Sequence, residues 1–367
     1  MGKSIDKITL KGFKSIEALE SFELRKLNVL IGANGAGKSN FVDYFRMLRA
    51  MADAAFQKYV LEAGGGDGFF FLGPKVTNEI TSRVDFGPNW FKHVLQPSGD
   101  GSMMIASETT GYGKTSGTYP ASKESYFKSR KDERSYRDRN YPGVGHFIYE
   151  SVSSWTVYHF HDTSALAPMR REHSLHDWRR FRHDASNMGA FLLHLQEEEP
   201  DGYRLIRDTI RLIAPFFDDF LLRPRNRGED ELVRLEWQQK GSDFPFQPNQ
   251  LSDGTLRFIC LATALLQPEP PATIVIDEPE LGLHPYAISM LADLIRSAAE
   301  RTQVIVSTQS PTLLDYFEPE DIVVVTRKQG RSEFERLDAE SLSEWLADYS
   351  VGELWQKNVV LGGPTSE

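Results

Sequence analysis

The fold of this 367-residue chain is decided by one stretch of sequence, LNVLIGANGAGKS, which occupies residues 27–39. Its first part, Leu27–Ile31, is largely apolar and predicts a buried strand. The next eight residues, Gly32–Ser39, match the pattern G-x-x-x-x-G-K-[ST]. Apolar side chains then recur at helical spacing from Asn40 to Tyr59. A strand, a glycine-rich loop and a helix in this order predict a phosphate-binding loop.

Each part of the predicted loop has a chemical role. Glycines let the backbone wrap so that its N–H groups point at phosphate oxygens, and the following helix adds its positive N-terminal end. Lys38 would reach the β- and γ-phosphates of ATP, and the Ser39 hydroxyl would ligate Mg²⁺. The alternative is a glycine-rich turn without a ligand. The residues predicted to hold ATP here are Gly32, Asn34, Gly35, Gly37, Lys38, Ser39 and Asn40.

A second apolar run, Thr273–Asp277, ends in two adjacent carboxylates, Asp277 and Glu278. We expect Asp277 to support Mg²⁺, directly or through water, and Glu278 to polarise the attacking water. Taken alone, such a run is equally a strand followed by a polar turn. The preceding phosphate loop favours the catalytic interpretation.

The run Leu251-Ser252-Asp253-Gly254-Thr255 precedes this second motif, starting 26 residues before Asp277. It resembles the signature motif of the ABC-type ATPases that include the SMC and RecF proteins. In that family the motif begins a helix, and it binds the γ-phosphate of ATP held by the other subunit. The resemblance implies this role for Ser252 and Gly254, and a helix over Leu256–Leu266. The alternative is an Asp-Gly turn that caps a helix.

Two further segments refine the resemblance. Glu280–Pro285 reads ELGLHP, which is similar to RecF-like and OLD-like ATPases and unlike transporter motors. His284 is either a catalytic group or a residue that shapes the loop facing the partner subunit. Gln309 follows the run Val304–Thr308, where the family pattern has a His that contacts the γ-phosphate. A Gln can donate a hydrogen bond but cannot become cationic, so we expect slow hydrolysis assisted by Lys38, Glu278 and Gln309.

The order of apolar segments predicts an α/β fold: a P-loop NTPase with a mixed or parallel doubly wound sheet, an antiparallel β subdomain and a helical insertion. Alternating segments near 79–86, 90–96 and 102–108 indicate an antiparallel meander. The resemblance covers residues 1–60 and 245–330, and it places the turn Lys11–Lys14 near adenine, with Phe13 equally suited to the core. The predicted parts are an N-terminal ATPase lobe (1–97), a flexible polar insertion (98–150), a helical subdomain (151–250), a C-terminal ATPase lobe (251–333) and a helical tail (334–367).

Charge and composition limit the choice of partners. The formal net charge is -10, so any case for nucleic acid must rest on a local basic patch. Two stretches combine Arg or Lys with aromatic residues, 123–140 and 170–183, and either could contact phosphates and stack on bases. The alternative is a solvated charged face or a protein-binding surface. Five histidines in 159–183 show no convincing metal-ligand spacing, and the lone Cys260 excludes an intramolecular disulfide and indicates core packing.

The N-terminal sequence has no signal peptide and no window is apolar enough to span a membrane, so we expect a cytoplasmic protein without a membrane partner. The resemblance implies a homodimer or higher oligomer that encloses ATP and gates a nucleic acid or an effector. Bacterial DNA repair or antiphage defence is the implied setting, with a separately encoded nuclease or toxin as the effector. Two alternatives stay open: a low-turnover switch that sequesters the effector, and the motor of a membrane transporter.

Overall fold

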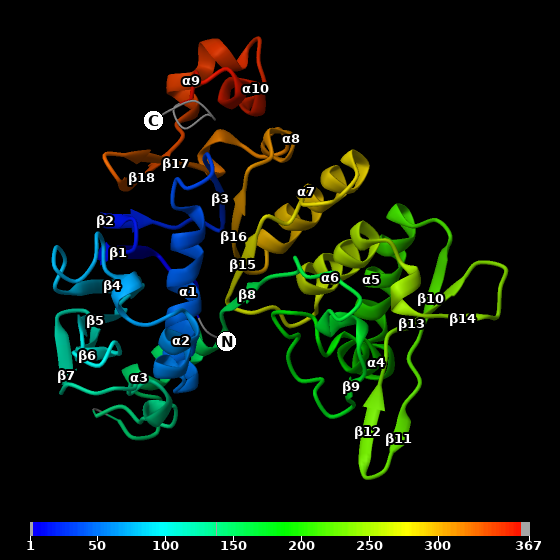
Figure 1. The fold of residues 1–367 in the computed structure, drawn as a ribbon, viewed down its shortest axis with the longest axis horizontal. Helices are drawn as coiled ribbons and strands as arrows, with labels where there is room; N and C mark the ends of the chain where they lie inside the picture. The colour runs from blue at the N-terminus through cyan, green and yellow to red at the C-terminus, as the bar shows by residue number, and fades with distance from the viewer. Residues whose placement is uncertain (1–2, 137, 361–367) are drawn as a thin grey trace. The chain divides into compact units, whose positions relative to one another are not determined.

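The computed structural model describes residues 3–136 and 138–360 (Figure 1). It divides into two compact units. The first unit takes in the chain up to Trp155, Pro271–Val275 and the chain from Thr302 onward. The second unit comprises Thr156–Pro270 and Ile276–Arg301.

The core of the first unit is a mixed sheet around the predicted strand Leu27–Ile31. This strand, β3, is fully buried and pairs in parallel with β16 on one side and β17 on the other. An antiparallel strand, β18, closes one edge by pairing with β17. The confirmed fold class, a P-loop α/β domain, follows from these parallel pairs. Its strands, in sheet order, are β18 (Arg331–Arg336), β17 (Ile322–Lys328), β3 (Leu27–Ile31), β16 (Gln303–Thr308) and β15 (Thr273–Asp277).

A second, antiparallel sheet of the first unit confirms the predicted meander. Strands β4, β5 and β6 follow one another with hairpin connections, and each pairs with the next in antiparallel register. Alternate side chains of β4 are buried, as expected for a sheet with one face on the core. The sheet order is β2 (Ile16–Glu23), β1 (Lys7–Phe13), β4 (Ile80–Phe86), β5 (Asn89–Pro97), β6 (Met103–Tyr112) and β7 (Thr115–Tyr119).

Residues 98–150 were predicted as a flexible polar insertion, and for much of that range the structure differs. β6 and β7 continue the meander over 103–119, and a helix, α3 (Val144–Ser154), begins at 144. The first part of β6 was predicted as the alternating segment near 102–108. The Gly, Ser and Thr residues that follow concealed the end of β6 and all of β7, which backbone pairing holds in the sheet.

The helices of the first unit include the one predicted after the phosphate loop. It is split in two, because Ala54 takes a left-handed backbone conformation with φ 58° between α1 and α2. The predicted C-terminal helix is likewise two short helices, α9 and α10. Besides α3, the helices are α1 (Lys38–Asp53), α2 (Phe56–Glu62), α8 (Pro311–Leu314), α9 (Ala339–Leu346), α10 (Val351–Gln356), and the short 3-10 turns η1 (Asp67–Phe69), η2 (Lys128–Arg130) and η5 (Pro319–Asp321).

The second unit is built on α6, whose residues from Leu256 to Leu266 are all buried. Cys260 lies in this helix with no exposed surface, which confirms its place in the core. The other helices are α4 (Met188–Glu198), α5 (Pro200–Ile213) and α7 (Pro285–Ala299), with turns η3 (Pro168–Arg170) and η4 (Pro248–Gln250). The strands of this unit are β8 (Thr156–Tyr158) and those of two small sheets. The first sheet is ordered β10 (Phe217–Leu221), β13 (Glu236–Gln239), β14 (Pro245–Phe246). The second is ordered β11 (Arg225–Arg227), β12 (Asp230–Val233), β9 (His173–Ser174).

None of the described helices is both long enough and apolar enough to span a bilayer.

Candidate nucleotide-binding site

The phosphate loop connects β3 to α1 in the first unit. Gly35 and Gly37 have φ values of +79° and +116°, a region that disfavours any residue with a side chain. A Cβ atom at Gly32 would overlap the Val325 carbonyl oxygen, and one at Gly37 would overlap the Ser332 hydroxyl. The loop therefore requires glycine at all three positions.

Lys38 is the first residue of α1 and is buried, with 5% of its surface exposed. Its ammonium group folds back into the loop and donates hydrogen bonds to the carbonyl oxygens of Gly32 (2.6 Å) and Ala33 (3.2 Å). The adjacent Ser39 is exposed. The positive end of α1 and the Lys38 ammonium thus lie at one place, which suits an anionic ligand.

A hydrogen-bond network that the sequence does not predict supports the phosphate loop. The Ser332 hydroxyl of β18 donates to the Ala36 carbonyl (2.5 Å) and lies 2.7 Å from the Ser15 hydroxyl. The side chain of Asn40, predicted to bind nucleotide, donates to Ser15 Oγ (2.6 Å). The structure therefore places the Asn40 amide in the support of the loop. Only the pairing of distant strands brings these residues together.

Two exposed residues lie at the rim of the loop. Asn34 is exposed in the turn of the loop. Arg327, at the end of β17, donates through Nη1 to the Gly35 carbonyl (3.0 Å) and was not predicted. Its guanidinium adds a second positive charge near the loop.

Gln309 follows β16, the neighbour of β3. Thr308 pairs with Ile31, the last residues of the two parallel strands, so Gln309 and Gly32 directly follow neighbouring strand ends. Gln309 is half-buried. The first unit therefore brings the phosphate loop and Gln309 to the same edge of the sheet, as expected for parallel strands.

The two carboxylates belong to the second unit, because the division between the units falls after Val275, within β15. Asp277 ends β15 and is buried, with 8% of its surface exposed. Glu278 is half-buried and has a positive φ of 45°, which is unusual for a residue with a side chain. The Asp277 carbonyl accepts a hydrogen bond from His161 Nε2 (2.9 Å).

The predicted signature segment begins α6, also in the second unit. Ser252 is the N-cap residue: its exposed hydroxyl accepts from the Thr255 N–H (3.2 Å) and lies 2.8 Å from the Thr255 hydroxyl. A Cβ atom at Gly254 would lie 2.6 Å from the Gly282 carbonyl oxygen. The second unit thus brings the signature segment against the loop that follows Asp277 and Glu278.

His284 caps the next helix, α7. Its Nδ1 atom accepts from the Tyr286 N–H at 3.4 Å, and the residue is exposed. This position fits the interpretation that His284 shapes the loop. At the other end of the chain, Phe13 is fully buried with its ring 5.9 Å from that of Tyr44, so it belongs to the core and does not face a base.

The two basic-aromatic stretches prove to be partly structural. Arg130 is buried and donates to the Thr110 hydroxyl (2.6 Å), and Phe127 is buried beside it. In the other stretch, Arg170 is buried and pairs with Asp253 (2.8 Å), while Arg182 pairs with Asp177 (3.0 Å). The exposed basic and aromatic residues of the two stretches include Lys123, Lys128, Lys131, Arg134, Tyr136, Arg139, Arg171, Arg179, Arg180 and Arg182.

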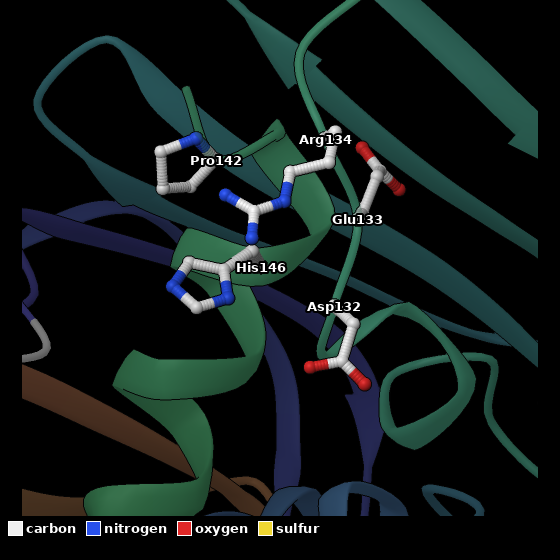
Figure 2. A pocket seen from close by; sticks show the side chains of 5 residues that line it. All are labelled: Asp132, Glu133, Arg134, Pro142 and His146. Atoms are coloured by element: carbon white, nitrogen blue, oxygen red, sulfur yellow. The ribbon is translucent and has the colours of Figure 1, made fainter. Parts of the chain in front are cut away.

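A small surface pocket of the first unit involves none of the predicted nucleotide-site residues. It is lined by the segment that follows η2 and by the first turn of α3, and in Figure 2 the Arg134 side chain extends between Pro142 and His146. Asp132 and Glu133 complete its lining. Both signs of charge meet in it, so it offers no preference for phosphate.

Comparison with known structures defines the class of protein. The chain is similar in fold to the Smc head bound to the C-winged helix domain of ScpA, with a TM-score of 0.58, 16% identity, and coverage of 92% of this chain and 99% of that one. The Smc head domain with an extended coiled coil, bound to the C-terminal domain of ScpA from Pyrococcus furiosus, gives a TM-score of 0.52 at 15% identity, with 94% and 99% coverage. These likenesses define the fold, which resembles the P-loop NTPase fold of SMC heads.

The family is set by sequence. The family described as "AAA domain, putative AbiEii toxin, Type IV TA system" matches residues 27–89 and 113–315, and this chain belongs to it. A comparison with curated proteins gives no match.

Proposed function

We propose that the protein binds and hydrolyses ATP as a homodimer in which each ATP lies between the phosphate loop of one copy and the signature segment of the other. The observation that carries the proposal is the loop itself. Its three required glycines, its buried Lys38 and its place at the start of α1 form a cradle of N–H groups and positive charge.

The residues present fit ATP and Mg²⁺. The Ser39 hydroxyl and the Asp277 carboxylate are hard oxygen ligands of the kind that Mg²⁺ prefers. When bound, Mg²⁺ neutralises charge on the phosphates and favours attack by water. Lys38 binds the β- and γ-phosphates, Glu278 orients and polarises the attacking water, and Gln309 donates a hydrogen bond to the γ-phosphate or to that water.

Ser252 supplies the cross-subunit contact in this proposal. The exposed hydroxyl and the free end of α6 present a helix N-terminus toward solvent, which suits a γ-phosphate held by a second copy. The fold similarity to Smc heads supports this arrangement. The cap of Thr255 is compatible with it, because a hydroxyl has a donor and two acceptor sites.

A second candidate function is a switch with little turnover. Gln309 favours it, since an amide cannot supply the positive charge that a protonated His would place near the γ-phosphate. In this form the protein holds ATP and sequesters an effector until ATP is lost. The same dimer serves both candidates.

The biological role that we propose is the gating of a separate nuclease or toxin, in bacterial antiphage defence or DNA repair. The family description, which names a toxin–antitoxin system, supports a role beside an effector. We propose that any cutting is done by this separate partner. Exposed arginines such as Arg171 and Arg179 are the candidates for contact with nucleic acid.

Phosphate release by the wild type and by Glu278→Gln separates the two candidates. An ATPase predicts steady release by the wild type and a drop of about 100-fold in the variant, with ATP affinity unchanged. Equal and negligible rates with retained ATP binding favour the switch. Failure of the wild type to bind ATP contradicts both.

A further inference from the structure

The backbone at Glu278 is in a conformation that needs support from its surroundings. Its φ of 45° lies in the left-handed region, which is unfavourable for a residue with a side chain. Such a conformation persists where neighbouring contacts fix it. Two residues of the second unit, His161 and Arg257, make those contacts.

His161 fixes the peptide group that enters Glu278. Its Nε2 atom lies 2.9 Å from the Asp277 carbonyl oxygen, which belongs to the Asp277–Glu278 peptide. A carbonyl can only accept, so Nε2 carries the proton and donates it. Because φ of Glu278 is the rotation between this peptide plane and its own Cα substituents, holding the carbonyl holds that rotation.

Arg257 fixes the other end of the same loop. Its Nη1 donates to the Leu281 carbonyl, and the Leu281 N–H donates to the Glu278 carbonyl (3.3 Å). The guanidinium also donates through Nε to Phe160 O (3.0 Å) and through Nη2 to His161 O (3.3 Å). One side chain therefore joins the segment that carries His161 to the loop that carries Glu278.

The environment of Arg257 suits a fixed structural donor. Only 6% of its surface is exposed, and burial lowers the pKa of its guanidinium, which nonetheless stays charged at neutral pH. Three carbonyl groups occupy its donors in different directions. A Lys side chain, with one charged nitrogen, could not reach all three.

Arg257 also lies five residues after Ser252 in α6, the helix of the signature segment. The start of the same helix touches the loop directly, since a Cβ at Gly254 would lie 2.6 Å from the Gly282 carbonyl. Any shift of the first turns of α6 therefore acts on Leu281 and Gly282.

We propose that His161 and Arg257 are positioning residues that hold Glu278 in the orientation needed to polarise water, and that they tie this orientation to the signature helix. The proposal rests on the proposed ATPase function for its kinetic consequence. Its structural part, that one imidazole and one guanidinium hold the loop, does not depend on ATP binding.

The test compares His161→Leu, which removes the donor, with His161→Gln, whose amide can donate to the same carbonyl. His161→Leu is expected to lower kcat about 10–100-fold, as a misplacement of about 1 Å does, while the KM and the affinity for ATP stay within about twofold. His161→Gln is expected to retain most of kcat. Arg257→Lys is expected to lower kcat as His161→Leu does.

Hydrogen–deuterium exchange without nucleotide tests the loop independently of turnover. The peptide covering 276–284 is expected to exchange at least about tenfold faster in His161→Leu than in the wild type, with the phosphate-loop peptide unchanged. The exposed His159, whose ring centroid lies 4.2 Å from that of His161, provides a matched control as His159→Leu, which should leave this exchange unchanged.

Three results would overturn the proposal: unchanged exchange at 276–284 in His161→Leu, equal losses in His161→Gln and His161→Leu, or a general rise in exchange across the second unit. A wild type without turnover refutes the ATPase function alone. In that case faster exchange limited to 276–284 still supports the positioning of the loop.

Discussion

Replacing Ser332 by Ala should weaken ATP binding although Ser332 faces no ligand. The side chain is 3% exposed, and its hydroxyl donates to the Ala36 carbonyl (2.5 Å) and contacts the Ser15 hydroxyl (2.7 Å). Removing one partner of a buried hydrogen bond costs about 1–3 kcal/mol. Because Ala36 is inside the phosphate loop, we expect half or more of this cost to appear as lost ATP affinity, roughly a 10-fold increase in Kd.

The assay is the Kd of a fluorescent ATP analogue, measured beside the urea midpoint of unfolding. Ser343→Ala is the matched control, because that exposed hydroxyl bonds only within α9, to the Glu340 carbonyl (2.9 Å). We expect the control to leave both quantities unchanged. A Ser332→Ala protein with a lower unfolding midpoint but the wild-type Kd would refute the link between this network and the shape of the loop.

Three further outcomes are expected. Gly254→Ala should abolish the ATP-dependent association of two chains, measured by sedimentation velocity, while the single chain keeps its affinity for ATP. The reason is that the new Cβ would lie 2.6 Å from the Gly282 carbonyl. Retained association would contradict this prediction. Burial lowers the pKa of His93 to about 3. The folded protein therefore protonates His93 less readily than the unfolded chain does. The free energy of unfolding should fall as the pH drops from 6.5 toward 3, by about 1.4 kcal/mol per pH unit. Burial raises the pKa of Glu108, which changes the stability with pH in the opposite direction. The contribution of His93 is therefore isolated by comparing the urea midpoints of the wild type and His93→Phe at pH 6.5 and 5. An equal pH dependence of the two proteins would contradict the argument. Cys260 is fully buried and burial raises the pKa of its thiol, so a thiol reagent should modify the native protein at least about 1000-fold more slowly than the urea-unfolded chain, and rapid native labelling would place Cys260 outside the core.

The parts of the fold that could be predicted are those recorded in short, contiguous patterns. Leu27–Ile31 and Val304–Thr308 are apolar runs of strand length, and the structure confirms both as buried neighbours. The glycine pattern that ends in Lys38 is equally local. Its positive φ values at Gly35 and Gly37 are a backbone requirement that a sequence pattern records directly.

The parts that could not be predicted depend on distant pairing. Ser15 and Ser332 are 317 residues apart, and only the sheet edges that carry them bring their hydroxyls together. The end of β6 and all of β7, beyond the predicted segment near 102–108, are not apparent from the sequence, because β7 is largely exposed and backbone pairing provides the stability. The sequence suggests no role for His161 beyond that of a metal ligand, and no spacing in it shows that the ring meets the Asp277 carbonyl.

Composition alone does not predict which arginines of the two basic-aromatic stretches are exposed. A count of arginines and aromatics treats all of them as surface, whereas Arg130 and Arg170 are buried and hold other segments in place. Burial and partner decide whether a guanidinium can meet a phosphate. The nucleic-acid proposal therefore rests on the arginines that the structure leaves exposed.

The central claim is that two copies complete each ATP site, and mixing two inactive variants tests it most directly. Lys38→Ala removes the phosphate-binding ammonium, and Ser252→Ala removes the hydroxyl that should reach the partner's ATP. In an equal mixture, half of the dimers contain one of each, and each of these has one intact site, so phosphate release should recover to about a quarter of the wild-type rate. Activity in the mixture no higher than the mean of the two separate variants would contradict the claim.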